Sequence, residues 1–168
     1  MFKEYAAGMV LLSYLAYLTY LAYPAVPPWL ASKAGMLPYV TKILDATFAT
    51  FRQPIHLPTV YRFVGANMVA AVPSLHAAYP LLTGLFVGRE SRRLIPVMAV
   101  YMASVWMAVI YLGEHYVFDV VAGVAYALVT YCLLRVWRKL KTRVANGQRN
   151  GKAEEDYDRQ PGPKWGML

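Results

Sequence analysis

The sequence predicts an all-α fold: a polytopic membrane helical bundle with about four transmembrane helices and a short interfacial helix in an outer loop. Hydrophobic residues make up 58% of the 168 positions and charged residues only 15%, a balance typical of membrane proteins. A spanning helix needs about 20 largely apolar residues. Four nearly uncharged segments meet this need, so we expect spans at about 6–24, 72–88, 94–112 and 117–136. None shows the strict alternation of barrel strands.

The first apolar segment is expected to stay in the protein as a span. A cleaved signal peptide is the alternative. However, Lys3 stands beside Glu4, the apolar core is long, and no convincing cleavage site precedes Pro24. The single cysteine, Cys132, falls inside the last predicted span, which excludes an intrachain disulfide and leaves the redox compartment open.

The segment between the first two spans, about 25–71, is too long for a plain connection, which is typical of a functional loop. It opens with Pro27-Pro28-Trp29, a stiff exit from the membrane with an aromatic ring suited to the interface. Apolar residues then recur at helical spacing, at Val40, Ile43, Leu44, Phe48 and Phe51. They predict a short helix that either lies in the membrane interface or packs on the spans, and the pattern favours neither.

Lysine and arginine collect on one side of the predicted bundle. Arginines occupy positions 89, 92 and 93 between the second and third spans, and basic residues follow the fourth span at 135, 138, 139, 141 and 143. The positive-inside rule makes this side cytoplasmic, so the long loop and the Glu114–Tyr116 turn face outside. We expect an integral protein of the plasma membrane. Topology then accounts for most of the +8 net charge, and no nucleic-acid partner is expected.

The chain is expected to form one membrane domain, residues 1–144, followed by a cytoplasmic tail, residues 145–168. The tail is rich in Gly, Asn, Gln, Pro and charged residues, a composition typical of disorder.

His115 and Asp119 are the first candidate pair for chemistry. They are four residues apart, so they share one helical face if the fourth span begins near Glu114. A carboxylate beside an imidazole fixes its tautomer and stabilises its charged form. The free ring nitrogen could then attack phosphorus and form a phosphohistidine. A structural hydrogen bond and part of a metal site are the alternatives for this pair.

Pro73-Ser74-Leu75-His76 is the second candidate motif. Pro and Ser are favoured where helices begin, so this tetrapeptide predicts the outer start of the second span. A helix start binds anions through its free N–H groups and its dipole, and the Ser74 hydroxyl would add a donor. His76 lies just inside, where it could protonate a leaving oxygen. The alternative is a plain cap followed by a buried, hydrogen-bonded histidine.

Together the two motifs resemble a known family. Residues 71–79 (AVPSLHAAY) and 111–123 (YLGEHYVFDVVAG) are similar to the second and third signatures of the type-2 phosphatidic acid phosphatase superfamily. The Pro-x-x-Pro-Pro-Trp element at 24–29 resembles its inositol phosphorylceramide synthase branch, and the whole resemblance covers about 14–137.

The resemblance implies a helical bundle that transfers phosphoryl groups of a lipid phosphate or phospholipid substrate, with no metal and no cofactor. By the same resemblance His115 is the nucleophile, Asp119 its partner, His76 the general acid and Ser74 a phosphate ligand. Hydrolysis and head-group transfer share the phosphohistidine step, and the sequence does not choose between them.

The chain departs from the family at its phosphate-gripping arginine. The places of the Ser-Arg pair hold Ala108 and Val109, and Arg52-Gln53-Pro54 is only a distant echo of the first signature. Other outer-side cations must therefore neutralise phosphate. The outer-side cations available are Lys33, Lys42, Arg52 and Arg62. Those taken as phosphate ligands are Arg62, which is nearest the second motif, Arg52 and Lys42.

Two further expectations follow from the departures. A catalytically inactive helical membrane partner or binding subunit that kept the motifs is the alternative function. A vanadate-dependent haloperoxidase, which has a similar pocket, is disfavoured by the missing arginine. Family members usually have additional spans before these four, so a homo-oligomer or a partner chain that supplies the missing helices is an open alternative.

Overall fold

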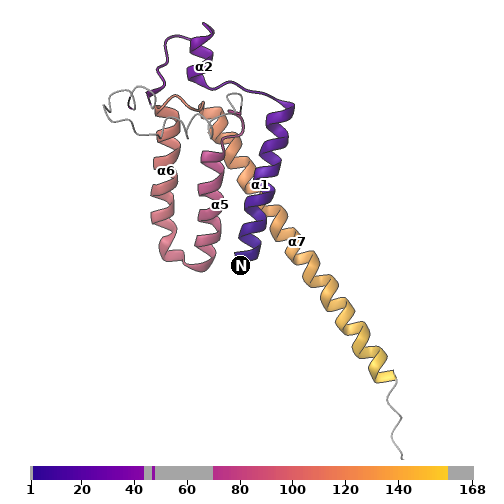
Figure 1. Cartoon of the computed structure of the whole chain (residues 1–168). Helices are drawn as coiled ribbons and strands as arrows, with labels where there is room; N and C mark the ends of the chain where they lie inside the picture. The colour runs from indigo at the N-terminus through magenta and orange to yellow at the C-terminus, as the bar shows by residue number, and fades with distance from the viewer. Residues whose placement is uncertain (1, 44–46, 48–69, 159–168) are drawn as a thin grey trace, which may run out of the picture. The chain divides into compact units, whose positions relative to one another are not determined.

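A computed structural model describes residues 2–43, 47 and 70–158, and this part of the chain is almost entirely helical. Its elements in order are α1 (Phe2–Ala22), α2 (Pro28–Lys33), α5 (Leu75–Glu90), the 3₁₀ helix η1 (Arg92–Leu94), α6 (Ile95–Tyr111) and α7 (Val117–Asp158) (Figure 1). The predicted all-α membrane fold is confirmed. The chain divides into two units, Met1–Tyr131 and Cys132–Leu168, so the start of α7 belongs to the first unit.

Three of the described helices are long and apolar enough to cross a membrane: Phe2–Ala22, Arg92–Tyr111 and Val117–Arg149. They fall on three of the predicted spans. The fourth prediction, 72–88, corresponds to α5, which begins at Leu75 and has 16 residues. At 1.5 Å per residue it is about 24 Å long, shorter than the roughly 30 Å hydrocarbon layer. The helix starts late because Pro73 and the cap residue Ser74 precede it.

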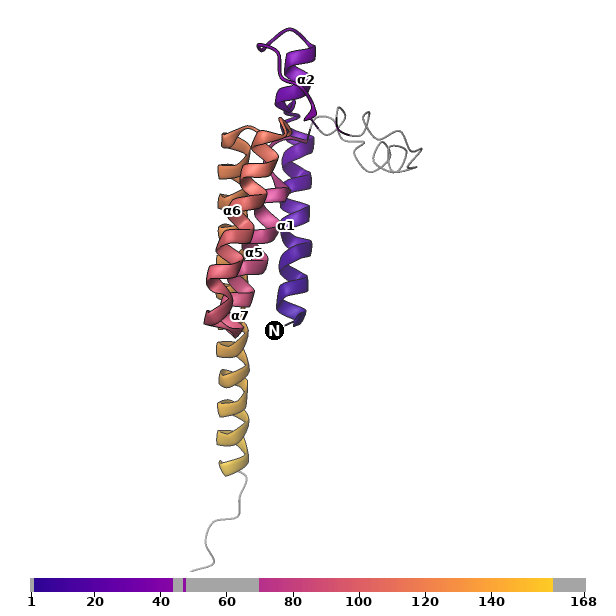
Figure 2. The ribbon, with the colours of Figure 1, turned by 90° about the vertical axis from the view of Figure 1, so that its left-hand side faces the viewer.

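In the first unit, α5 packs against both α1 and α6 (Figure 2). Polar side chains join the helices, as is common inside membranes. On the α1 side, the Tyr5 hydroxyl lies 3.1 Å from Thr83 Oγ1, and Ser13 Oγ lies 2.8 Å from the Tyr79 hydroxyl. On the α6 side, the Trp106 indole donates to the carbonyl of Ala77 at 3.3 Å. These contacts make α5 the most enclosed helix of this unit, with Ala77, Ala78 and Leu82 fully buried.

The segment after α1 returns to the start of α5. The N–H of Ala71 donates to the carbonyl of Ala25 at 3.1 Å, and the Trp29 N–H donates to Gly113 at 3.3 Å. Most of the predicted loop helix lies outside the described residues. Within them Val40 is not helical and Ile43 is.

α7 extends beyond its predicted end. We expected a span to about residue 136 and a tail without structure from about residue 145, whereas the helix continues to Asp158. Extending an existing helix needs no new nucleus, so residues such as Ala145 and Gln148 can continue it despite Gly147. Residues 159–168 of the predicted tail lie outside the described part.

Candidate active site

The start of α5 and the start of α7 approach each other at Gly123. A Cβ atom built on Gly123 would lie 2.3 Å from the carbonyl oxygen of Ser74 and 3.2 Å from the Cβ of Ala77. Only glycine allows this approach. A backbone hydrogen bond joins the same two helices, since the Ser74 N–H donates to the Asp119 carbonyl at 3.0 Å. The PSLH motif and the His-x-x-x-Asp pair are thereby brought together.

A tight turn between α6 and α7 positions His115. Gly113 has φ +74°, a left-handed conformation that favours glycine. The N–H groups of Glu114 and His115 both donate to the carbonyl of Val109 at 3.2 Å. α7 begins at Val117, so His115 precedes the helix instead of lying on its first turn. The turn, not helical periodicity alone, sets the direction of the imidazole.

Two histidines and an aspartate form a line of contacts. His76 Nδ1 lies 3.3 Å from His115 Nε2, and His115 Nδ1 lies 3.4 Å from Asp119 Oδ2. The latter distance is that of an ion pair, and His115 Nδ1 has no hydrogen-bond partner among the described residues. Asp119 Oδ2 instead accepts the Tyr116 N–H at 2.8 Å. Asp119 is 1% exposed and His115 8% exposed, whereas His76 is exposed. The backbone thus holds the carboxylate, and the carboxylate lies beside the inner nitrogen of His115.

Ser74 adds a buried hydroxyl to this cluster. It is the N-cap residue of α5, yet its side chain makes no capping hydrogen bond. The residue is fully buried, and in the described part of the chain its Oγ has no hydrogen-bond partner. Burying a hydroxyl without a partner costs free energy, about 1–3 kcal/mol. Its O–H therefore remains able to donate to a ligand at the positive end of α5.

A model of the PAP2 superfamily matches residues 1–133 of this chain. The chain belongs to the PAP2 superfamily. The match covers both motifs and all of the clustered residues, so the resemblance inferred from residues 71–79 and 111–123 is confirmed.

One curated relative is similar over 108 residues at 32% identity: the phosphoinositol dihydroceramide synthase of Bacteroides thetaiotaomicron. The alignment covers 61% of this chain and 35% of that protein, so the chain spans about a third of the relative's length. No solved structure matches the chain.

Val109, which stands where the resemblance implies the family's arginine, is buried in an apolar cluster. Val109 is 8% exposed and packs with Ala77 and Val120. These neighbours adjoin His76 and Asp119 in the sequence, so an apolar side chain occupies this place next to the candidate site.

Of the three cations predicted to bind phosphate, the structure describes only Lys42. Its Nζ lies 3.9 Å from Glu114 Oε1 and 4.5 Å from the centre of the Trp29 ring. Glu114 is the residue before His115, so the ammonium group lies near the histidine turn. Arg52 and Arg62 lie outside the described residues.

Trp29 and Glu114 were not predicted as site residues. Trp29 was expected to be an interfacial aromatic, but its backbone N–H donates to the carbonyl of Gly113 in the histidine turn and its ring lies beside Lys42. Glu114 was treated only as a turn residue. A carboxylate directly before the candidate nucleophile, at the edge of an apolar span, was the signal that could have identified it.

The described residues contain no group of three or more His, Cys, Asp or Glu side chains arranged to hold a metal ion. His76, His115 and Asp119 form a line in which the two imidazoles face each other.

Proposed function

We propose that this protein is an integral membrane lipid-phosphate phosphatase or phospholipid head-group phosphotransferase that acts through a phosphohistidine. The observation that carries the proposal is the line of contacts from His76 through His115 to Asp119, beside the buried hydroxyl of Ser74. This arrangement offers a nucleophile, a group that orients it, an acid and a phosphate donor within one cluster.

In the first step, the lone pair of His115 Nε2 attacks phosphorus. A P–N bond forms, the bond from phosphorus to the lipid oxygen breaks, and His76 gives its proton to that oxygen. Asp119 beside Nδ1 stabilises the positive charge that develops on the imidazole. In the second step, water or an alcohol attacks the phosphohistidine, returns a proton to His76 and releases His115.

His76 has to move when the phosphate enters. The attacking and leaving atoms lie roughly in line on opposite sides of phosphorus. With 3.3 Å between the two ring nitrogens, phosphorus has no room between them. His76 is exposed, so its side chain can turn away from His115 towards the leaving oxygen, whereas the buried His115 stays in place.

Several weak interactions neutralise the phosphate charge in place of the arginine of the family. Ser74 and the N-terminus of α5 supply hydrogen bonds, and Lys42 supplies a positive charge near the His115 turn. Arg52 and Arg62 remain proposed phosphate ligands. No metal or cofactor is required in this mechanism.

Head-group transfer is supported by the name of the relative, a phosphoinositol dihydroceramide synthase. The decisive assay gives the purified protein a panel of lipid phosphates and phospholipids, with and without inositol or ceramide acceptors. Release of inorganic phosphate indicates hydrolysis, and acceptor-dependent product indicates transfer. Loss of activity in chelator that zinc or magnesium restores would contradict the metal-free mechanism.

A catalytically inactive membrane partner or binding subunit is the second candidate. The burial of Val109 at the arginine position favours it, because the family's main phosphate ligand is missing. Binding of phospholipid without turnover, by protein that retains its helical structure, would support this candidate over the enzyme.

We propose that the site faces outside the cell, as the basic loops predict. In a Cys132→Ser background, a cysteine at the 89% exposed Tyr39 should react with a membrane-impermeant thiol reagent in intact cells. A cysteine at Ser91, in the link between α5 and η1, should react only after permeabilisation. Labelling of Ser91 in intact cells would reverse the orientation.

A further inference from the structure

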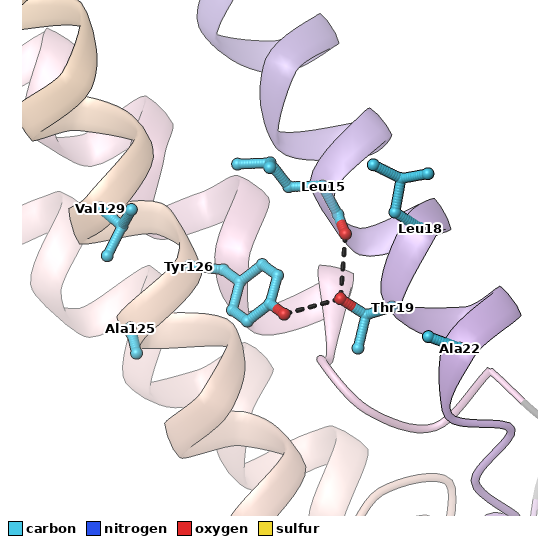
Figure 3. A pocket seen from close by; sticks show the side chains of 7 residues that line it. All are labelled: Leu15, Leu18, Thr19, Ala22, Ala125, Tyr126 and Val129. Carbon is cyan, nitrogen blue, oxygen red and sulfur yellow. Dashed lines mark hydrogen bonds between the residues drawn. The ribbon is translucent and has the colours of Figure 1, made fainter.

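An apolar groove of about 480 Å³ runs between α1 and α7 in the first unit (Figure 3). Its α1 wall consists of Leu15, Leu18, Thr19 and Ala22, and its α7 wall of Ala125, Tyr126 and Val129. The small side chains Ala22 and Ala125 leave the space open. The groove is open at the molecular surface, since Leu18 is 59% and Val129 53% exposed.

The groove's two hydroxyl groups bind each other. Thr19 Oγ1 and the Tyr126 hydroxyl lie 2.6 Å apart, and Thr19 also donates to the carbonyl of Leu15 at 3.0 Å (Figure 3). A hydrocarbon occupant would therefore leave no polar group of the groove without a partner. A polar occupant would gain little there, because these hydroxyls are already engaged.

The groove lies on the C-terminal side of the candidate active site along α7. Asp119 and Tyr126 are seven residues apart and share one face of the helix. The end of the groove nearest the site, at Ala125, is about 9 Å along the helix axis from Asp119, at 1.5 Å per residue. Headgroups occupy about 5–8 Å on each side of the hydrocarbon layer. A phosphate bound beside Asp119 would thus have its acyl chains entering hydrocarbon at the depth of the groove.

We propose that this groove holds one acyl chain of the lipid substrate while the phosphate occupies the His115 site. This inference rests on the proposed function and adds a subsite to it. A neighbouring helix fits less well, because a helix with its side chains is about 10 Å across and would cover the opening without filling it. A second copy of the chain is therefore not the expected occupant.

Filling the groove should weaken use of long-chain substrates alone. For Ala125→Phe we expect kcat/KM on dioleoyl phosphatidic acid to fall about tenfold, the effect of overpacking a site. Activity on dihexanoyl phosphatidic acid should change less than about twofold, since its short chains do not need the groove. The control is Leu128→Phe, which adds the same ring at an exposed position of α7 outside the groove, and should leave both activities unchanged. Equal losses on both substrates, or no loss on either, would overturn the inference.

A binding readout separates this inference from the proposed function. Phosphatidic acid with a photoreactive diazirine in one acyl chain should crosslink to the groove, at Leu18 or Val129, and Ala125→Phe should abolish those crosslinks. Unlabelled phosphatidic acid should compete, whereas diacylglycerol, which lacks the phosphate, should not. Crosslinks spread evenly over exposed α6 residues such as Val97 and Val100 would overturn the groove. Groove crosslinks without any turnover would keep the subsite and refute the enzyme.

Discussion

The two ends of α5 carry ionisable side chains in different arrangements. At the first turn, His76 meets His115, a group of the same type, beside a buried serine hydroxyl without a described partner. At the last turn, Arg89 forms an ion pair with Glu4 of α1 at 3.4 Å and lies 5.3 Å from the Phe86 ring centre. The second arrangement joins opposite charges and ties α1 to α5. The first places two imidazoles and a buried hydroxyl together, and it is the end at which we propose that a ligand binds.

The largest effect should come from His115→Ala, which removes the proposed nucleophile at the site end. We expect turnover to fall about a thousandfold or more, because the covalent intermediate forms on His115 and the other imidazole of the site, His76, is assigned to protonating the leaving oxygen. The measurement is turnover of a lipid phosphate by purified protein, together with acid-labile labelling from a radioactive phosphate donor. Unchanged thermal stability would show that the variant folds. Wild-type activity in a folded His115→Ala variant would refute the mechanism.

Asp119→Asn should be less severe, with a loss of about a hundredfold, because the imidazole that attacks phosphorus is still present. The amide oxygen can still accept the Tyr116 N–H, so the turn keeps its shape. The negative charge next to His115 is lost, and with it the stabilisation of the charged imidazole. We therefore expect a lower kcat with little change in KM. An increase in KM alone would assign Asp119 to substrate binding instead.

Gly123→Ala tests whether the two motifs depend on the close approach of α7 to α5. Its Cβ would lie 2.3 Å from the Ser74 carbonyl oxygen, so one helix has to shift. We expect a destabilisation of about 1–3 kcal/mol, measured by thermal unfolding, and a loss of activity of about tenfold or more.

Gly147→Ala is the matched control for this substitution. A Cβ there meets nothing within 4 Å, so stability should stay the same or rise by about 0.5–1 kcal/mol. Equal effects of the two substitutions would mean that the Gly123 approach is unimportant.

The sequence predicted the helices and the motif residues, but not the contacts that join them. Long uncharged segments locate α1, α6 and α7, because bilayer thickness sets their length. The same segments place Ser74 and His115 at one membrane side. The contact at Gly123 could not be predicted, since a glycine inside a span has many other uses.

The loop residues could be predicted least. The backbone N–H of Trp29, at the start of the short helix α2, donates to the Gly113 carbonyl. Lys42, which follows α2 in a segment without regular structure, lies over the Trp29 ring and near Glu114. A contact that depends on the path of an irregular segment produces no regular spacing of residue types in the sequence. The extension of α7 to Asp158 was also missed, because composition describes an isolated segment and not one that continues a formed helix.

Lys42→Ala should have a moderate effect at the site end. We expect KM for a lipid phosphate to rise about tenfold with a smaller change in kcat, as for the loss of one charge-assisted contact. Lys42→Arg should retain most of the affinity. Lys33→Ala is the control, since Lys33 lies farther from the Trp29 ring centre, at 5.5 Å. Equal effects of Lys33→Ala and Lys42→Ala would indicate a general surface charge.

The smallest effect should come from the other end of α5. Arg89→Ala removes the ion pair with Glu4. The Arg89 side chain is 20% exposed and the Glu4 side chain 18% exposed. Partly exposed pairs contribute about 0–1 kcal/mol, and the Phe86 contact adds about as much. We expect a small decrease in thermal stability and unchanged kcat and KM. The decrease should be smaller at high salt, because salt already screens the ion pair in the unmodified protein. Because α5 links the two ends, a change in kcat would mean that the pair holds the helix in register for His76. The Arg89–Glu4 ion pair would then contribute to catalysis at the other end of α5, instead of only stabilising the packing of α1 on α5.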